Sequence, residues 1–150
     1  MIEGTSPVEN HLSYALAAAH RSLTQTLSER LKKHGVQIEA WRILEFLDNG
    51  ERLTMGRLAE LALINRPALS KLVDRMVADG MVHRQIATSD QRQINLLLTA
   101  IGKKRMMQIR QEIVEQEDEM LSRIGAVQQK ELVAALRALS DKLDGQAANP

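Results

Sequence analysis

The sequence has 150 residues, of which 44% are hydrophobic and 26% are charged, a balance typical of one soluble globular domain that excludes a disordered or collagen-like chain. It contains no cysteine, which excludes disulfides, thiolate metal sites and cysteine-based redox sensing. The net charge is +1, and the basic surplus lies in residues 51–98, which carry seven Lys or Arg against five Asp or Glu. Only Tyr14, Trp41 and Phe46 are aromatic, so we expect an aliphatic and mainly helical core.

Several classes of protein are disfavoured by what the sequence lacks. No apolar run approaches the roughly 18 residues of a membrane span, and the N-terminal residues do not have the pattern of an export signal, so we expect a cytoplasmic protein. A glycine-rich phosphate loop, a nucleophile elbow and paired carboxylates in an apolar setting are also missing. We therefore expect neither an enzyme nor a bound cofactor.

The first predicted element is a long helix over residues 7–34. Ser6-Pro7-Val8-Glu9 forms a capping box with proline at the first helical position, and Gly35 can end the helix. One face carries apolar residues at steps of three or four, over roughly 42 Å of helix. These residues are Val8, Leu12, Leu16, Ala19, Leu23, Leu27 and Leu31.

A second helix is predicted from Ile38 to Leu47. Its inward face is expected to hold Trp41, Leu44 and Leu47, and Asp48-Asn49-Gly50 is a stop and turn signal.

Two further helices are predicted close together. Thr54 can cap a short helix that ends at Ala62, and Asn65 can cap another that Gly80 ends. The apolar residues of the latter have helical spacing. They are Leu69, Leu72, Val73, Met76 and Val77.

After residue 80, the spacing of the apolar residues changes from that of a helix to the alternation of a strand. Residues 82–86 and 94–98 each alternate in the manner of a strand, and the polar residues 87–93 lie between them. This pattern predicts a two-stranded hairpin with a long polar tip.

Two C-terminal helices are predicted within residues 100–144. Thr99 can cap the first and Gly125 can end it, and residues 145–150 are expected to be a flexible tail. Together with the first helix, these helices carry more apolar surface than a small lobe over residues 36–98 can cover. A second copy of the chain is the simplest partner, so we expect a homodimer; an intramolecular three-helix bundle is the alternative.

The pair of helices followed by a hairpin is typical of a winged helix-turn-helix, whose second helix enters the major groove of DNA. Opposite its apolar residues, that helix presents small and basic side chains, which allow the backbone to approach DNA and supply contacts to bases and phosphates. They are Pro67, Ala68, Ser70, Lys71 and Arg75, with Asp74 among them. At the hairpin tip, Arg92 can enter a narrow minor groove, and Asp90 can orient Arg92 or simply favour a turn.

This arrangement resembles the MarR family of bacterial transcriptional regulators. The resemblance is carried by the run from Arg66 to Arg84, then Asp90-Gln-Arg92, then Leu96-Leu-Leu-Thr99, in family order with the flanking helices. It implies a homodimer on a pseudo-palindromic operator and a repressor released by a small aromatic or phenolic ligand. It also implies that Arg92 reads the minor groove and that Arg66 and Arg75 approach phosphates. Pro67 and Ala68 replace the hydroxyl residues of many members, so the operator cannot be transferred from relatives.

The resemblance further implies a ligand pocket where the dimerisation helices meet the winged lobe. The expected residues are Tyr14, His20, Trp41, Arg42 and Phe46; the alternative for Trp41 and Phe46, which the sequence favours, is that they belong to the core.

Metal sensing and protein binding are the alternatives to DNA binding. The four histidines have no i, i+3 or i, i+4 pairing with one another, so no metal site is expected, and the acidic residues from Glu112 to Glu119 are expected to form a solvated helix face. A winged-helix adaptor that binds only proteins is the main alternative function. Such an adaptor does not need Arg92 at a polar tip.

Overall fold

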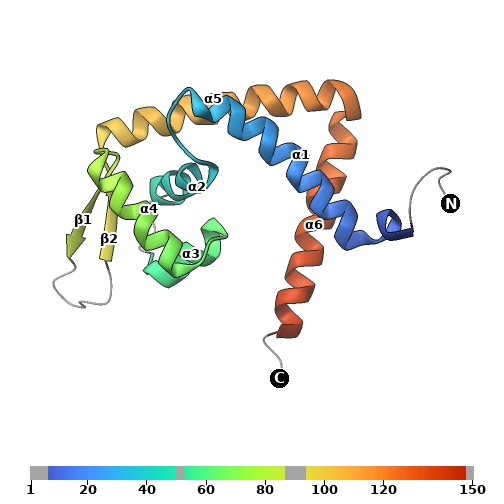
Figure 1. Ribbon diagram of the computed structural model, residues 1–150, viewed down its shortest axis with the longest axis horizontal. Helices are drawn as coiled ribbons and strands as arrows, with labels where there is room; N and C mark the ends of the chain where they lie inside the picture. Colours follow the sequence, from blue (N-terminus) through green and yellow to red (C-terminus); the bar gives the residue numbers. More distant parts are fainter. Residues whose placement is uncertain (1–6, 50–52, 87–93, 148–150) are drawn as a thin grey trace. The chain divides into compact units, whose positions relative to one another are not determined.

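The computed structural model describes residues 7–49, 53–86 and 94–147. Over these residues the chain is mainly helical and has one two-stranded antiparallel sheet, which confirms the predicted fold class (Figure 1). The described residues form two compact units, one up to Glu112 and the other from Ile113 onward. None of the helices described is long and apolar enough to cross a membrane.

The N-terminal helix starts later than the sequence pattern predicts. Residues Pro7–Asn10 form a short 3-10 helix, and helix α1 spans Leu12–Lys32. Between them, His11 has extended backbone angles and precedes the first helical residue. Asn10, His11 and Ser13 are all weak helix formers, so a break here costs little. The capping box begins at Ser6, which lies outside the described residues.

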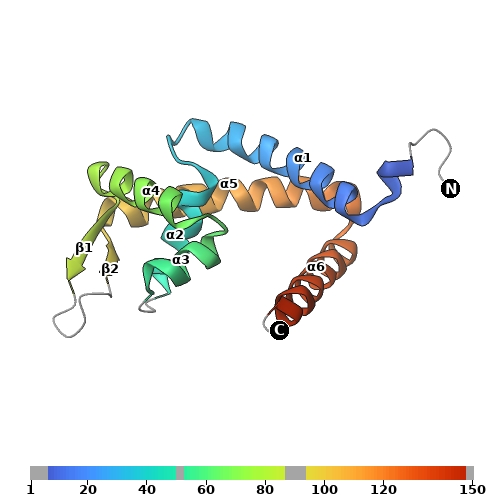
Figure 2. The same cartoon turned by 60° about the horizontal axis from the view of Figure 1, so that its bottom comes forward.

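Helix α2 (Ile38–Asp48) lies at the centre of the first unit, surrounded by α3 (Met55–Ala62), α4 (Arg66–Ala78) and the start of α5 (Ala100–Ile124) (Figures 1 and 2). Leu44 is buried as predicted, but Trp41 and Leu47 are only half-buried, and the fully buried neighbour is Ile43. The buried face of α2 is therefore shifted by about one residue from the predicted one. The core of the unit is aliphatic, as expected. Its most deeply buried members include Leu31, Ile43, Leu44, Leu58, Leu69, Val73, Met76, Val82, Met106 and Ile109.

The hairpin has the predicted strands. Strand β1 (Val82–Ile86) pairs antiparallel with β2 (Ile94–Leu98), in a register that sets Val82 opposite Leu98. Val82 and Leu96 are buried whereas Leu97 is exposed, which agrees with the alternation read from the sequence.

Helix α5 (Ala100–Ile124) begins against the turn that leads into the hairpin. Thr99 caps it as predicted, since its hydroxyl accepts a hydrogen bond of 3.0 Å from the Gly102 amide and also donates to the Gly80 carbonyl. The Thr99 amide donates to the Met81 carbonyl at 3.1 Å. At Gly102 the α5 backbone comes so close to Met81 that an added Cβ would lie 2.0 Å from the Met81 oxygen. Only glycine therefore fits at this position.

The second unit contains the end of α5 and helix α6 (Ala126–Ala147), separated only by Gly125. Gly125 has a φ of 89°, a conformation that L residues with side chains rarely adopt, so it permits the sharp turn. The predicted tail from residue 145 is wrong for its first three residues, because α6 continues through Ala147. Several apolar side chains of α6 are at least 48% exposed. They are Val127, Leu132, Val133 and Leu143.

Replacing Gly102 with alanine is expected to destabilise the fold by about 3 kcal/mol, because the neighbour that has to yield is backbone and not a flexible side chain. Urea unfolding followed by circular dichroism measures this change. The matched control is Gly56→Ala in α3, where nothing lies within 4 Å of an added Cβ, and there the stability should rise by roughly 0.5 kcal/mol. Equal stability of the two variants would contradict the close approach at Gly102.

Candidate nucleic-acid interface

Helices α3 and α4 form the predicted helix-turn-helix, and both of their predicted caps are present. The Thr54 hydroxyl accepts from the Arg57 amide at 3.1 Å, and the Asn65 side chain accepts from the Ala68 amide at 2.8 Å. Between the helices, Leu63 has a φ of 62° and a side chain that is 74% exposed. A leucine in this left-handed conformation costs about 1 to 2 kcal/mol, so the tight turn is maintained against local strain.

Helix α4 has one buried face and one exposed face. Leu69, Leu72, Val73 and Met76 are buried against the rest of the lobe. The α4 residues that are expected to meet DNA are all exposed. They are Arg66, Pro67, Ala68, Ser70, Lys71 and Arg75.

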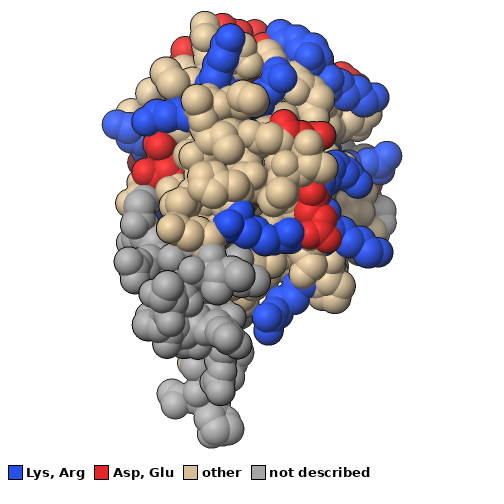
Figure 3. Space-filling view, turned by 90° about the vertical axis from the view of Figure 1, so that its left-hand side faces the viewer, with Lys and Arg blue, Asp and Glu red and all other residues tan. Residues whose placement is uncertain are grey.

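Charge near α4 is distributed so that the cations of its exposed face stay available. Arg84 of β1 forms an ion pair with Asp74, the acidic residue on that face, and so joins the hairpin to α4. Among the described residues, neither Lys71 nor Arg75 has an ion pair. Figure 3 shows Lys and Arg side chains around a largely uncharged surface at the hairpin end of the lobe, with some acidic side chains between them. The expected tip residues Asp90 and Arg92 lie outside the described residues.

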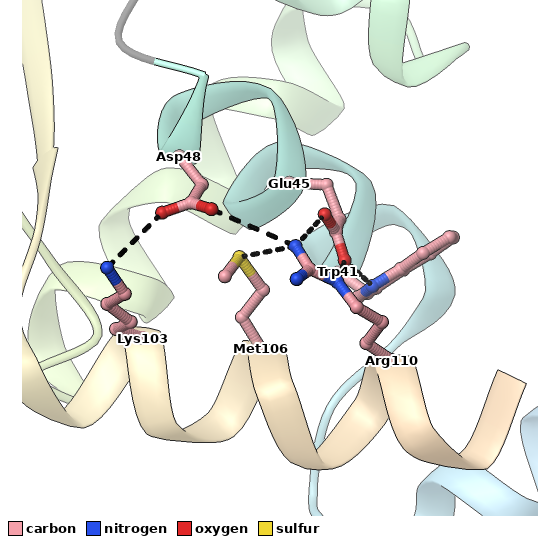
Figure 4. A network of polar contacts seen from close by, with 6 residues as sticks. All are labelled: Trp41, Glu45, Asp48, Lys103, Met106 and Arg110. Carbon is pink, nitrogen blue, oxygen red and sulfur yellow. Dashed lines mark hydrogen bonds and ion pairs between the residues drawn. The ribbon is translucent and has the colours of Figure 1, made fainter. Parts of the chain in front are cut away.

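A polar network joins α2 to α5 (Figure 4). The Arg110 guanidinium donates two hydrogen bonds to Glu45, of 2.9 Å from Nε and 2.6 Å from Nη2. Trp41 Nε1 donates to the same carboxylate at 2.9 Å. Asp48 extends the network, 3.8 Å from Arg110 Nη2 and 3.9 Å from Lys103 Nζ. The hydrogen bonds from Arg110 hold the pKa of Glu45 below its usual value, and partial burial opposes them.

A second polar contact joins the end of α1 to α5. Glu112 pairs with Lys33 and lies 3.2 Å from His34 Nε2, and these partners lower the pKa of Glu112. Glu112 is buried, so the expectation that it belongs to a solvated acidic face is wrong. Lys33 and His34 are far from it in the sequence, and helical spacing alone gave no sign of the contact.

A cleft of about 1110 Å³ opens between the C-terminal half of α1, the start of α2 and the exposed side of α4. Of the five residues expected in a ligand pocket, only His20 and Arg42 line this cleft. Tyr14, Trp41 and Phe46 do not, because Trp41 points to Glu45 and Arg110 and Tyr14 lies nearer the start of α1. The residues described in the lining are His20, Thr24, Ser28, Lys32, Val36, Gln37, Ile38, Glu39, Arg42, Leu63, Ile64, Ala68, Lys71, Leu72 and Arg75.

Comparisons with known proteins agree with this architecture. The sequence model of the MarR family matches residues 34–93. FarR, an HTH-type transcriptional regulator of Neisseria gonorrhoeae, is 30% identical over 136 residues, which cover 89% of this chain and 93% of FarR. The chain belongs to the MarR family of helix-turn-helix transcriptional regulators, as the recognition helix and wing indicated.

Two solved structures are informative about the fold. NadR in complex with 4-hydroxyphenylacetate is 28% identical, with a TM-score of 0.75, and the match covers 92% of this chain and 97% of that one. The repressor CouR, solved bound to a 23-mer DNA duplex, is 20% identical, with a TM-score of 0.84 over 93% and 98% of the two chains. At 20% identity, the likeness to CouR supports only the assignment of the fold.

Replacing Glu45 with glutamine should lower the stability by about 1 kcal/mol at pH 7, since a charged hydrogen-bond acceptor is lost. The pKa of Glu45 is lowered in the folded state, so its contribution is complete above the unfolded value of about 4.3 and is lost as the pH falls through the folded pKa. The stability of Glu45→Gln should therefore change less than that of the wild type between about pH 5 and pH 3. Thermal unfolding followed by Trp41 fluorescence measures both effects.

Glu60→Gln is the matched control, because Glu60 pairs with Arg57 at 3.1 Å on an exposed surface. It should change the stability by no more than about 0.5 kcal/mol. Parallel pH profiles for the wild type and Glu45→Gln would contradict the role given to the Arg110 contact.

Proposed function

We propose that the protein is a homodimeric repressor that binds a pseudo-palindromic operator in double-stranded DNA and is released by a small aromatic or phenolic ligand. The observation that carries the proposal is the exposed side of α4, which lies next to a hairpin and presents small residues together with cations that have no ion pair among the described residues. Membership of the MarR family of transcriptional regulators supports it. We further propose that it acts in the cytoplasm and has no catalytic activity of its own.

Each DNA-facing residue has a role in this proposal. Pro67, Ala68, Ser70 and Lys71 face the bases of the major groove, where the apolar pair meets thymine methyl groups and Lys71 meets guanine. Arg66 and Arg75 contact phosphates, and Arg92, oriented by Asp90, enters the minor groove.

The proposed dimer is supported by exposed apolar side chains at both ends of the chain. Leu12 is 61% exposed on α1, and Leu132 and Leu143 are 53% and 56% exposed on α6. Exposure of this kind along helices is typical of a surface that another chain covers.

A ligand is supported by the cleft, by its mixed lining and by NadR, a structural relative solved with 4-hydroxyphenylacetate. Sites for small ligands are concave and mostly apolar, with a few polar groups that fix the orientation. We assign the ligand to the cleft beside His20 and Arg42, and not to the neighbourhood of Trp41.

Selection of genomic fragments with the purified protein tests DNA recognition. We expect an enriched site with half-sites about 10 bp apart, because the two-fold symmetry of the protein is matched in the operator. On that operator, Lys71→Ala and Arg92→Ala should each cost about 1 to 3 kcal/mol, and Lys71→Ala should also relax the base preference at one position of each half-site.

Lys130→Ala on α6 is the control, since it removes one exposed positive charge far along the chain from the DNA-facing residues. All affinities are compared at one salt concentration, because phosphate contacts are strongly salt-dependent. Failure to enrich any site, or wild-type affinity of both DNA-face variants, would refute specific binding through these residues.

The dimer is tested by the double substitution Leu132→Glu and Leu143→Glu. Glutamate forms helices well, so α6 should persist while the association is lost. Sedimentation velocity at micromolar concentration should show a dimer for the wild type and for Gln128→Glu, which adds charge at an exposed polar position of α6, and a monomer for the double variant. A monomeric wild type, or a double variant that stays dimeric, would be the contrary result.

A further inference from the structure

Asp74 is the acidic residue of helix α4, and its side chain is 66% exposed on the side of the helix that is proposed to meet DNA. On a helix, residues three or four positions apart are neighbours, whereas adjacent residues do not face each other. Of the four residues at those spacings from Asp74, only Lys71 is basic. An ion pair between these two side chains would occupy the amine that is proposed to meet guanine.

The structure pairs Asp74 with Arg84 of β1 instead. Arg84 shares one face of the hairpin with Val82, and its partner in the register is Leu96. Both of these neighbours are buried, so this face of the hairpin is packed against the lobe. From there Arg84 Nη2 donates to the Asp74 carboxylate. Within the described part of the chain, Lys71 has no ion pair.

Two physical reasons favour Arg84 over Lys71 as the partner of Asp74. A guanidinium is more weakly hydrated than an ammonium group and presents its donors in a fixed plane. A pair within α4 would also place the cation three residues before the acid, which is the less favourable orientation in the field of the helix dipole. The Asp74 carboxylate is therefore held by the hairpin.

We infer that Arg84 is a positioning residue of the DNA interface, because by holding Asp74 it keeps the Lys71 amine free to meet the bases. The consequence for DNA binding rests on the proposed function, to which the inference adds a residue that acts without touching DNA. When Arg84 is removed, the Asp74 carboxylate turns to Lys71 and lies unneutralised on the DNA-facing side. Arg84 thus contributes to operator affinity through Asp74.

The reactivity of the Lys71 amine in the free protein tests the first step without DNA. Reductive methylation at each lysine is quantified by mass spectrometry for the wild type, for Arg84→Gln and for Arg84→Gln combined with Asp74→Asn. We expect Lys71 to react about 2-fold more slowly in Arg84→Gln, since an amine paired with a carboxylate is less available. The double variant should react at the wild-type rate. An unchanged rate at Lys71 in Arg84→Gln would overturn the inference.

Operator binding, measured by fluorescence anisotropy on the selected operator, tests the second step. At one salt concentration, Arg84→Gln should bind about 3-fold more weakly than the wild type, as expected for an exposed charge pair. Adding Asp74→Asn should restore the wild-type affinity, and Arg84→Lys, which keeps the pair, should bind close to the wild type. Lys130→Gln on α6 removes one positive charge as a control and should leave the affinity unchanged.

Other roles of the pair give different patterns of affinity. If Arg84 contacted a phosphate directly, the loss in Arg84→Gln would persist after Asp74→Asn is added. If Asp74 itself contacted DNA, Asp74→Asn alone would bind more weakly, whereas we expect it to bind at least as tightly as the wild type. Either pattern would overturn the inference. Asp74→Asn changes an exposed side chain, so it keeps this comparison open even where Arg84→Gln does not fold.

Failure of the inference and failure of the proposed function are distinguishable. If the wild type selects no operator, the proposed function fails, and the methylation rates in the free protein still decide whether Arg84 holds Asp74 away from Lys71. If the operator is bound but the rates and affinities do not follow the expected order, only the role of Arg84 is refuted.

Discussion

The bidentate contact between Arg110 and Glu45 holds the central helix α2 against the first half of α5, and the other parts of the lobe are positioned from there. Trp41 donates to the same carboxylate, so the one tryptophan of the chain belongs to this joint. The close approach of Gly102 to Met81 attaches the turn before the hairpin to the same helix. In the same lobe, α4 buries Leu69, Leu72, Val73 and Met76, which leaves Lys71 and Arg75 on its exposed side.

The cations on the exposed side of α4 lie on the surface proposed to meet DNA and also border the cleft. They are available to a polyanion because Arg84 neutralises Asp74, and the other cations of the cleft, Lys32 and Arg42, come from α1 and α2.

Local signals predicted most of the fold, and long-range contacts account for what they missed. Caps at Thr54, Asn65 and Thr99 follow from short-range chemistry, and so do the glycine stops and the alternating strands. The break at His11 was missed because apolar periodicity continues through it. The family resemblance predicts a ligand pocket where the first helix meets the lobe, and two of its five expected residues, His20 and Arg42, line the cleft. The lining also joins α1 to the helix-turn-helix through Lys32, Leu63 and Arg75, residues whose proximity no spacing in the sequence reveals. Asp90 and Arg92 remain predictions.

The central claim is that the exposed side of α4 meets DNA, and the reactivity of the Lys71 amine tests this most directly. Reductive methylation of the protein, quantified at each lysine by mass spectrometry, is compared for the free protein and for the complex with the selected operator. The account predicts that Lys71 is protected in the complex, while Lys130 and Lys142 on α6 react as in the free protein. Full reactivity of Lys71 in the presence of saturating operator would contradict it.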